Sequence, residues 1–567
     1  MDLQQCHNPL FAREKVQDLD GEWLFSFDNV VWQTIRVPFC PQSDLSGIGR
    51  KDFFDCCYYK RSFTVNRDGN LAILHFGAVD YFAEVYVNGK FVCSHTGGFT
   101  PFEADITKFC REGENELFIL VRDCNRDIPF GKQSWKENSF GCFYTRTTGI
   151  WQSVWIEYAP EKRVKEFYFT PNVGNRSVTV DLITTDEGSY KIDVFLHGNL
   201  VGNAGGTMSF RENIVVPLDE EALWEAGKGE LYEVKITFCS DEVYSYFGLR
   251  EVKYDGYKFL LNGKEIFQKL VLDQGYYPDG IYTAPNVEAM QNDIRIASEL
   301  GFNGARLHQK VFDPKFLYLC DKAGYMVWGE FPSWGVDFST MQFAGRFLTE
   351  WQEAIKRDFN HPCIVTWCPL NEVWGDWENP KKKRDMRFVD AVYEFTKKLD
   401  PTRPCVDVSG GHHGHKTDLF DFHCYEPIEK IKQYLTELEE KDKIDVPLLY
   451  CEGDDEPRFS GGVAVNFSEC GGISFGQSAL RQSEVNECAV QSTESWGYGN
   501  GENNGDGFVR RYEELMAAIF SSRKISGFCY TQLYDVEQEQ NGFYKYDRSD
   551  KLTPEQKEEI RKINSRR

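Results

Sequence analysis

Two β-sandwich domains followed by a (β/α)8 barrel are the fold that the sequence predicts. Alternating apolar residues and turn signals run from the N-terminus to about residue 253. Near residue 255 the apolar period becomes that of helices, and eight candidate strands then alternate with helices or long loops. A chain of 567 residues is too long for one hydrophobic core, so about two to four domains are expected.

The part of the chain before the barrel predicts two separate β domains. In residues 1–160, Ala83, Val85 and Val87 alternate with Glu84 and Tyr86, and Asn88-Gly89 supplies a two-residue hairpin turn. In residues 161–253, positions 232–238 alternate between apolar and polar side chains, as in a half-buried strand. About ninety residues of this kind fit an immunoglobulin-like β-sandwich.

Residues 254–567 show the pattern of a barrel built from βα units. One helical face is apolar from Val287 to Leu300, with Asn286 as N-cap and Gly301 as the C-terminal stop. A second helix is predicted to open at Asp313-Pro314 and to end at Gly324. The candidate strands lie near residues 268–273, 302–307, 325–330, 363–370, 404–409, 420–424, 464–469 and 526–533. Eight such units fit a (β/α)8 TIM barrel with insertions, whose usual size is roughly 250 residues.

Charge and cysteine spacing exclude several classes of partner and cofactor. The net charge is −24 and the isoelectric point about 5.0, so the surface is expected to repel nucleic acid and anionic membranes. The 18 cysteines form no Cys-x-x-Cys pair and no Cys/His ligand spacing, so neither a zinc site nor a redox site is predicted. The first residues lack a signal-peptide pattern, and no apolar stretch of about eighteen residues occurs. A cytoplasmic protein with reduced thiols is therefore expected.

Polar residues that end otherwise apolar barrel strands are the candidate site residues. Active sites of such barrels form at the C-terminal ends of the strands. A single strand-end Asn or Asp often only caps the next helix, but several converging polar ends indicate a pocket. These residues are Asp273, Gln274, Arg306, His308, Glu330, Asn371, Glu372, His423, Tyr425, Glu469, Gln532 and Asp535.

Carboxylates at the ends of different strands indicate glycoside hydrolysis. In the retaining mechanism one carboxylic acid protonates the leaving oxygen, and a second carboxylate about 5–5.5 Å away attacks the anomeric carbon. Glu372 fits the acid, and its neighbour Asn371 is placed to hold the 2-hydroxyl of the sugar. The alternative for Glu372 by itself is an ordinary surface or capping glutamate.

Several motifs in order resemble glycoside hydrolase family 2, the β-galactosidase, β-glucuronidase and β-mannosidase family. "GGFTPFEADIT" and "GIWQSVWIE" are similar to its N-terminal domain, and "LWEAGKGELYEVKI" to its immunoglobulin-like domain. "LVLDQGYYPDG", "GFNGARLHQKVFDPKFLYLCDKAGYMVWGEFP" and "HPCIVTWCPLNEVWG" resemble successive barrel segments. The resemblance implies a jelly-roll sugar-binding-like domain at 1–160, an immunoglobulin-like sandwich at 161–253 and a catalytic TIM barrel at 254–567. It also implies that Glu372 is the general acid/base.

Two segments compete for the nucleophile. "VPLLYCEGD" offers Glu452, whereas "VNFSECGGISF" offers Glu469 within Ser468-Glu469-Cys470-Gly471-Gly472. The family pattern is Ser-Glu-x-Gly-Gly, so the resemblance favours Glu469, and the glycines let the backbone turn sharply beside a ligand. Family members usually carry an aromatic or aliphatic residue where this chain has Cys470, which we interpret as a small packing residue.

The remaining strand-end residues are candidate sugar ligands. Arg306 is placed to keep the pKa of the nucleophile low, because a nearby cation favours the carboxylate. Tyr425 is expected to orient Glu469 by a hydrogen bond. His308 and His423 are equally compatible with a structural role. The predicted substrate-binding set is Asn371, Asp273, Arg306, His308, His423, Tyr425, Trp496 and Gln532.

The identity of the sugar is predicted from the loop after the last strand. The β-glucuronidases of this family read the substrate carboxylate with an Asn-x-Lys pair there, whereas this chain has Glu539-Gln540-Asn541-Gly542-Phe543. Asn379-Pro380-Lys381 has the spacing but follows the fourth strand, within a basic loop. A neutral hexose is therefore favoured, with galactose first on family frequency.

The overall prediction is a retaining exo-β-glycosidase with a covalent glycosyl-enzyme, a β-galactosidase above all. β-Glucuronidase, β-glucosidase and β-mannosidase are alternatives within the family, and a catalytically inactive carbohydrate-binding protein is an alternative from another class. A glycoside or oligosaccharide is the expected partner, with homo-oligomers as in other family members. No cofactor is required, and no metal site is assigned, although some members bind Mg²⁺ or Na⁺.

Overall fold

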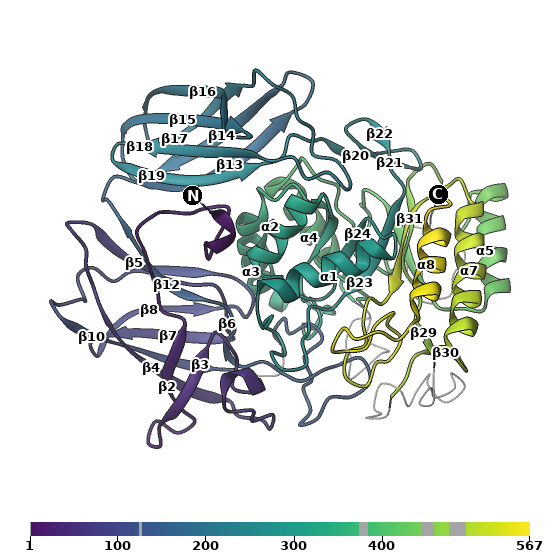
Figure 1. The fold of residues 1–567 in the computed structure, drawn as a ribbon, viewed down its shortest axis with the longest axis horizontal. Helices are drawn as coiled ribbons and strands as arrows, with labels where there is room; N and C mark the ends of the chain where they lie inside the picture. Colours follow the sequence, from purple (N-terminus) through teal and green to yellow (C-terminus); the bar gives the residue numbers. More distant parts are fainter. Residues whose placement is uncertain (1, 124–126, 374–383, 445–458, 460, 476–494) are drawn as a thin grey trace.

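Two β-sandwiches lie beside a barrel of parallel strands and helices in the computed structural model of the chain (Figure 1). It describes residues 2–123, 127–373, 384–444, 459, 461–475 and 495–567. Among these residues, no helix has the length and apolar character that crossing a membrane requires. Three short 3₁₀ helices, η1, η2 and η3, span Leu3–Gln5, Asp44–Ser46 and Met341–Phe343.

The N-terminal sandwich packs a six-stranded sheet against a four-stranded sheet. The orders are β3-β2-β4-β10-β7-β8 and β1-β12-β5-β9, with β6 paired to β11. The strands are β1 (Val16–Asp18), β2 (Gly21–Ser26), β3 (Gln33–Val37), β4 (Cys56–Thr64), β5 (Leu71–Phe76), β6 (Val79–Asp80), β7 (Phe82–Val87), β8 (Lys90–Thr96), β9 (Phe102–Asp105), β10 (Glu114–Arg122), β11 (Gly149–Ile150) and β12 (Val154–Ala159). The predicted hairpin turn is confirmed, because Asn88 and Gly89 join β7 to β8 with φ of 51° and 73°.

The second sandwich packs three strands against four. The orders are β13-β14-β17 and β16-β15-β18-β19, and their inner faces share one apolar core. The strands are β13 (Val164–Asn172), β14 (Ser177–Thr184), β15 (Gly188–Leu196), β16 (Asn199–Met208), β17 (Arg211–Pro217), β18 (Tyr232–Phe238) and β19 (Asp241–Phe247). The alternation predicted for residues 232–238 is confirmed in β18. The jelly-roll and immunoglobulin-like classes and the domain limits stay predictions.

A parallel sheet with helices outside it forms the third part. A small sheet of β20 (Val252–Asp255), β21 (Lys258–Leu261) and β22 (Lys264–Glu265) precedes it. The seven strands follow the order β26-β25-β24-β23-β31-β28-β27, as expected for a TIM barrel. They are β23 (Gln268–Asp273), β24 (Gly304–Leu307), β25 (Met326–Glu330), β26 (Ile364–Cys368), β27 (Phe420–Cys424), β28 (Val465–Gly471) and β31 (Ile525–Thr531).

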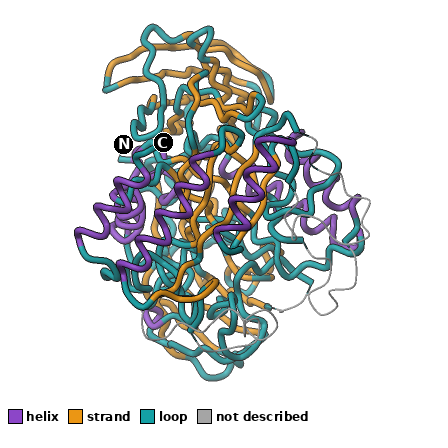
Figure 2. The backbone as a smooth tube through the Cα atoms, turned by 90° about the vertical axis from the view of Figure 1, so that its right-hand side faces the viewer, coloured by secondary structure: helices purple, strands orange, loops and turns teal. Residues whose placement is uncertain are grey.

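Helices cover the outside of these strands (Figure 2). They are α1 (Val287–Glu299), α2 (Pro314–Ala323), α3 (Ala344–Asp358), α4 (Met386–Leu399), α5 (Ile428–Lys441), α7 (Gly505–Ser521) and α8 (Pro554–Asn564), and β29 (Ile473–Phe475) pairs with β30 (Tyr498–Glu502). The predicted helix starts are confirmed: Asn286 accepts from the Ala289 N–H, and Asp313 accepts from the Lys315 N–H. Gly324 ends α2 in the left-handed conformation.

The strand predicted at residues 404–409 is not a regular strand. This segment runs beside the end of β26 but makes only two isolated bridges, Trp367 with Cys405 and Asn371 with Ser409. Pro369, midway along the neighbouring segment, lacks an N–H and therefore interrupts the ladder, whereas the Pro404 carbonyl accepts from the Trp367 N–H at 2.9 Å. The segment still brings Ser409 next to Glu372, where the Glu372 N–H donates to the Ser409 carbonyl at 2.9 Å.

A buried carboxyl joins the N-terminal sandwich to the barrel. The Tyr81 hydroxyl, just before β7, donates to Glu350 on α3. Burial raises the pKa of Glu350 to about 8, with Asp80 and Glu353 adding to the rise. The folded protein therefore holds a proton at neutral pH that the unfolded chain releases above its ordinary pKa near 4.5.

Replacing Glu350 with glutamine is expected to stabilise the protein at neutral and higher pH. A folded-state pKa above the unfolded value means that wild-type stability falls as pH rises between those two values, and an amide cannot lose that proton. We expect the midpoint of thermal unfolding to rise by about 2 °C or more at pH 8. The same comparison at pH 5 should show little difference. A variant that is destabilised at both pH values would contradict this account of Glu350.

Candidate active site

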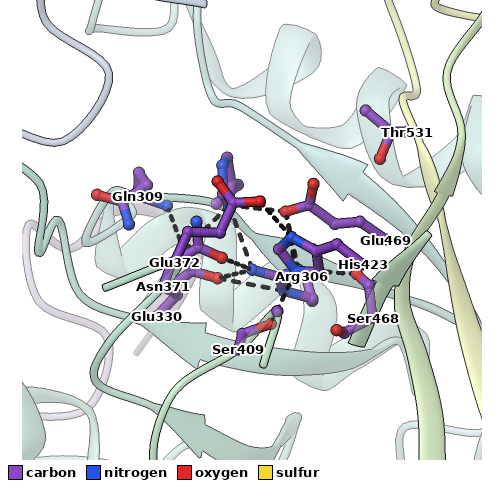
Figure 3. Close-up of polar contacts among 12 residues, drawn as sticks. Arg306, Gln309, Glu330, Asn371, Glu372, Ser409, His423, Ser468, Glu469 and Thr531 are labelled. Atoms are coloured by element: carbon purple, nitrogen blue, oxygen red, sulfur yellow. Dashed lines mark hydrogen bonds and ion pairs between the residues drawn. The ribbon is translucent and has the colours of Figure 1, made fainter. Parts of the chain in front are cut away.

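Arg306 is the centre of a buried hydrogen-bond network at the C-terminal ends of the barrel strands (Figure 3). It lies on β24, and no part of its side chain is exposed. Nη1 donates to the Ser468 carbonyl at 2.7 Å and to Glu469 Oε1 at 3.1 Å. Nη2 donates to Glu330 Oε2 at 2.7 Å and to Asn371 Oδ1 at 2.8 Å. One guanidinium thus orients groups from β25, β28 and the segment after β26.

Glu469 is held as an ionised carboxylate near the end of β28. Besides the Arg306 contact, Oε2 accepts a 2.5 Å hydrogen bond from the Tyr425 hydroxyl, as the sequence predicts. Burial alone would raise the pKa of Glu469, but His423, Arg306, His308 and the Tyr425 hydrogen bond lower it to about 2. A carboxylate that stays charged and is fixed at both oxygens suits a nucleophile.

Glu372 faces Glu469 from the loop that follows β26. Its backbone has a φ of 45°, which turns the chain sharply, and its side chain is 20% exposed. Figure 3 shows the two carboxylates on the same side of Arg306, directed toward one another. One oxygen of each lies within 4.8 Å of the other. This upper bound is compatible with the roughly 5–5.5 Å between the carboxyl groups of retaining glycosidases and is shorter than the roughly 6.5–9.5 Å of inverting pairs.

His423 on β27 lies between the two carboxylates. Its Nδ1 is 2.6 Å from Glu372 Oε1, and its Nε2 is 3.4 Å from Glu469 Oε1. Burial alone would lower the pKa of His423, but Glu469 and Glu372 raise it above its ordinary value. With a proton on Nδ1, His423 donates to Glu372 and fixes the orientation of that carboxyl group.

Asn371 presents a free donor beside these groups. Its side chain is fully buried and Oδ1 accepts from Arg306, yet among the described residues Nδ2 has no hydrogen-bond partner. A buried amide without a partner costs free energy. The Asn371 carbonyl accepts from the Trp334 indole N–H at 2.9 Å, so the backbone is fixed as well. A substrate hydroxyl would satisfy the unpaired Nδ2.

Glu330 and His308 form the rear of the network. Glu330 Oε1 lies 3.0 Å from His308 Nδ1 and accepts from the Gln309 N–H at 3.0 Å. Burial alone would raise the pKa of Glu330, but Arg306 and His308 lower it to about 2. Burial lowers the pKa of His308. The edge of the His308 ring meets Trp334, with ring centroids 6.2 Å apart.

Three predicted ligands, Asp273, Gln532 and Trp496, lie outside the Arg306 network, and their role as sugar ligands stays a prediction. The Asp273 carboxylate caps its own turn, accepting from the Gly275 N–H at 2.9 Å and from the Tyr534 hydroxyl. This is the local capping role that strand-end acids commonly have. Burial raises the pKa of Asp273 to about 6.

The other two, Gln532 and Trp496, are engaged by loops. Gln532 Oε1 accepts from Gln274 Nε2 at 2.9 Å, and Gln532 Nε2 donates to Asn541 Oδ1 at 2.8 Å. The Trp496 indole donates to the Gly141 carbonyl at 2.8 Å. Trp496 lies one ring from the site, because it contacts Tyr498, which stacks on Tyr425 at 3.6 Å.

Sequence reasoning missed residues that come from other parts of the chain. Ser409 and Trp334 lie on loops, and Lys132 belongs to the N-terminal sandwich, more than two hundred residues before the acid/base candidate. No spacing rule within the barrel points to them. The competing nucleophile Glu452 and the basic Lys381 lie outside the described residues.

A parallel barrel with two carboxylates at this spacing is the site architecture of retaining glycosidases. Family models agree: residues 252–470 match the family 2 TIM barrel domain of glycosyl hydrolases, and residues 51–160 match the sugar binding domain of the same family. The chain belongs to glycoside hydrolase family 2. Members of this family are glycoside hydrolases.

Relatives of this chain carry two kinds of activity in their names. A β-galactosidase of Thermoanaerobacter pseudethanolicus is 28% identical over 415 residues, covering 68% of this chain and 53% of the relative. A β-glucuronidase of Streptococcus agalactiae is 25% identical, covering 64% of this chain and 68% of the relative. The chain spans about half the length of the first curated relatives that it matches.

Solved structures share the fold over nearly the whole chain. A β-glucuronidase of an uncultured Clostridium species superposes with a TM-score of 0.78 at 20% identity, covering 98% of this chain and 99% of the other. A β-galacturonidase of Eisenbergiella tayi bound to galacturonate gives a TM-score of 0.76 at 20% identity, with 98% coverage of both chains. At this identity the likeness establishes the fold.

Proposed function

We propose that this protein is a retaining exo-β-glycosidase that removes a terminal β-linked sugar. The observation that carries the proposal is the Glu372–Glu469 pair, whose oxygens lie within 4.8 Å at the strand ends. The two groups have different surroundings. Glu469 is held by Arg306 and Tyr425, which favour its charged form. Glu372 is partly exposed and is hydrogen-bonded to His423.

The reaction proceeds in two displacements. In the first, a Glu469 oxygen forms a bond to the anomeric carbon while the bond to the glycosidic oxygen breaks, and the leaving oxygen takes the proton of Glu372. In the second, Glu372 as carboxylate takes a proton from water, and the water oxygen displaces Glu469 from the anomeric carbon. The anomeric configuration is retained, and both carboxyl groups return to their starting states.

Asn371 and Arg306 support this sequence of steps. Asn371 Nδ2 is positioned to donate to the 2-hydroxyl of the glycone, a hydrogen bond that strengthens in the oxocarbenium-like transition state. The Arg306 guanidinium donates to both Asn371 and Glu469, so the positions of these two side chains relative to one another are fixed when a sugar binds.

The glycone class is open between two kinds named among the relatives, galactosides and uronides. The sequence favours a neutral galactoside because the loop after β31 has no Asn-x-Lys pair. A panel of nitrophenyl β-glycosides tests this directly, with galactoside, glucuronide, galacturonide, glucoside, mannoside and fucoside. A protein that binds sugars but turns over none of them would favour the inactive carbohydrate-binding alternative.

Replacing Glu372 with glutamine is expected to lower kcat by about 10²–10⁴-fold, because the leaving oxygen loses its proton donor and the water its base. The loss should be smallest for nitrophenolate, which leaves without protonation, and largest for an alkyl glycoside. Azide, which needs no base, should restore turnover and yield the β-glycosyl azide.

The matched control is Glu429→Gln, an exposed glutamate in the first turn of α5, which should keep wild-type rates. Equal losses for Glu372→Gln on good and poor leaving groups, without azide rescue, would assign Glu372 a role other than acid/base.

A further inference from the structure

A loop of the N-terminal sandwich reaches the barrel site and carries Lys132. The Phe130 N–H donates to the Trp334 carbonyl at 2.9 Å. Gly131 follows with a φ of +62°, and a Cβ there would lie 2.3 Å from the Gln309 carbonyl oxygen. The backbone just before Lys132 therefore packs directly on the loops that follow β24 and β25, at a distance that only glycine allows.

The chain is fixed on the other side of Lys132 as well. The Tyr144 N–H donates to the Lys132 carbonyl at 2.7 Å, and the Ser134 N–H donates to the Tyr144 carbonyl at 2.8 Å. The Tyr144 hydroxyl donates to Glu539 in the loop after β31 at 2.5 Å. Lys132 thus starts from a backbone held between two barrel loops, and this constrains where its ammonium group can lie.

The Lys132 side chain is 94% buried, with an exposure of 6%, and its ammonium lies over the Trp334 ring. Nζ is 4.7 Å from the ring centroid. The same indole donates to the Asn371 carbonyl and meets the His308 ring edge. The ammonium group is therefore one ring away from two members of the Arg306 network.

In the described part of the chain, Lys132 Nζ lies over the rings of Trp334 and Tyr144, 4.7 and 6.0 Å from their centroids, and makes no hydrogen bond or ion pair. Burial alone would lower the pKa of Lys132, but Cys142, Glu539, Glu469 and Glu372 raise it above its ordinary value, so the ammonium stays charged. A buried ammonium has three donors to satisfy and is costly without an anion in contact.

The nearby carboxylates are already engaged by other groups. Glu539 accepts from Tyr144 and from Asn541 Nδ2, Glu469 from Arg306 and Tyr425, and Glu372 contacts His423. These anions keep Lys132 protonated at a distance without contacting it. Because no carboxylate of the described residues contacts Lys132, an anionic group of the ligand can pair with it.

We propose that Lys132 determines glycone specificity, and that the glycone is a hexuronic acid whose C6 carboxylate pairs with the Lys132 ammonium. This inference rests on the proposed glycosidase function of the same site. A uronic acid glycone replaces the neutral galactoside that the sequence favours, because the cation comes from the N-terminal sandwich and not from the barrel loop after β31. Glu539, a carboxylate in the loop after β31, is hydrogen-bonded to Tyr144 and Asn541.

The test compares Lys132→Met with Lys132→Arg on paired nitrophenyl β-glycosides, each uronide against the hexoside of the same C4 configuration. For wild type we expect the uronide to be preferred. Lys132→Met should lower kcat/KM for the uronide by about 10²-fold or more, since a buried charge loses its partner. The matching hexoside should change by less than about threefold, since its C6 hydroxymethyl carries no charge. Lys132→Arg should keep part of the uronide preference.

Lys136→Met is the matched control, because Lys136 lies on the same loop with an exposed side chain. It should behave as wild type. Equal losses for uronide and hexoside in Lys132→Met would make Lys132 a structural residue and overturn the proposal, as would a wild-type preference for the hexoside.

A binding measurement separates this proposal from the proposed catalytic function. Calorimetry with sodium glucuronate and sodium galacturonate, against glucose and galactose, needs no turnover. If wild type hydrolyses nothing but binds a uronate through Lys132, the catalytic proposal fails and the specificity proposal stands. If no uronate binds and no uronide is hydrolysed, the specificity proposal is wrong.

Discussion

Glu469→Gln is expected to abolish double-displacement turnover, lowering kcat by about 10⁴-fold or more on whichever aryl glycoside the wild type hydrolyses. An amide oxygen in place of the carboxylate cannot form the glycosyl ester. The fold should survive, since glutamine has the same shape; its single amide oxygen can still accept from Arg306 Nη1, and its NH2 group can donate to the Tyr425 hydroxyl oxygen. Thermal unfolding checks this, because the kinetic loss counts only if the variant unfolds as one cooperative species.

Covalent labelling distinguishes Glu469 from the competing Glu452. A 2-deoxy-2-fluoro glycoside with a good leaving group should accumulate as a glycosyl ester, because fluorine slows both displacements whereas the good leaving group speeds only the first. Mass spectrometry of peptides from the labelled wild type should place the sugar on Glu469. A label on Glu452, or full activity of Glu469→Gln, would show that the nucleophile is another residue.

Arg306→Met is expected to cost both stability and activity. It leaves Glu330 and Glu469 without their shared cation, and breaking a buried ion pair typically costs about 3–5 kcal/mol. The pKa of Glu469 should then rise, because Arg306 is one of the groups that lower it. Activity should fall by about 10²-fold or more, and the acidic limb of the kcat/KM profile should move to higher pH.

The pH dependence of stability gives Arg306→Met a second readout. In wild type the pKa values of Glu330 and Glu469 lie below their ordinary values, at about 2 each. Their contribution to stability is therefore present above pH 4.5 and is lost as the pH falls toward 2. Arg306→Lys, which keeps the charge without the bidentate fork, is the control and should retain part of both properties. An unchanged pH profile in Arg306→Met would mean that Arg306 does not set the protonation of Glu469.

Local sequence was sufficient to predict the helix caps and the hairpin turn, because these features depend only on residues close together in the chain. Asn286 and Asp313 cap α1 and α2 by accepting from N–H groups two or three residues away, and Asn88-Gly89 turns β7 into β8. Local sequence was misleading at residues 404–409, where an apolar strand pattern is present but Pro369 on the neighbouring segment interrupts the ladder.

Part of the candidate active site could also be predicted from the sequence. Strand ends of a barrel meet at one edge, so Arg306, Asn371, Glu372, His423 and Glu469 were found together from their positions alone. The same rule included Asp273, whose carboxylate caps its own turn outside the Arg306 network, because a strand-end carboxylate can serve either the pocket or its own turn. Which of the two it serves depends on contacts with distant residues such as Tyr534.

The sequence by itself determined the family, the order of the domains and the pair of carboxylates, because these follow from local patterns and from motifs in order. Only the tertiary structure decided that the two carboxylate oxygens lie within 4.8 Å, that Arg306 joins four residues, and that Lys132 enters the site from another domain. The physical reason is that burial, charge and hydrogen-bond satisfaction depend on every group packed around an atom. Lys132 and Asn371 contact the same Trp334 side chain only because the N-terminal sandwich packs on the barrel.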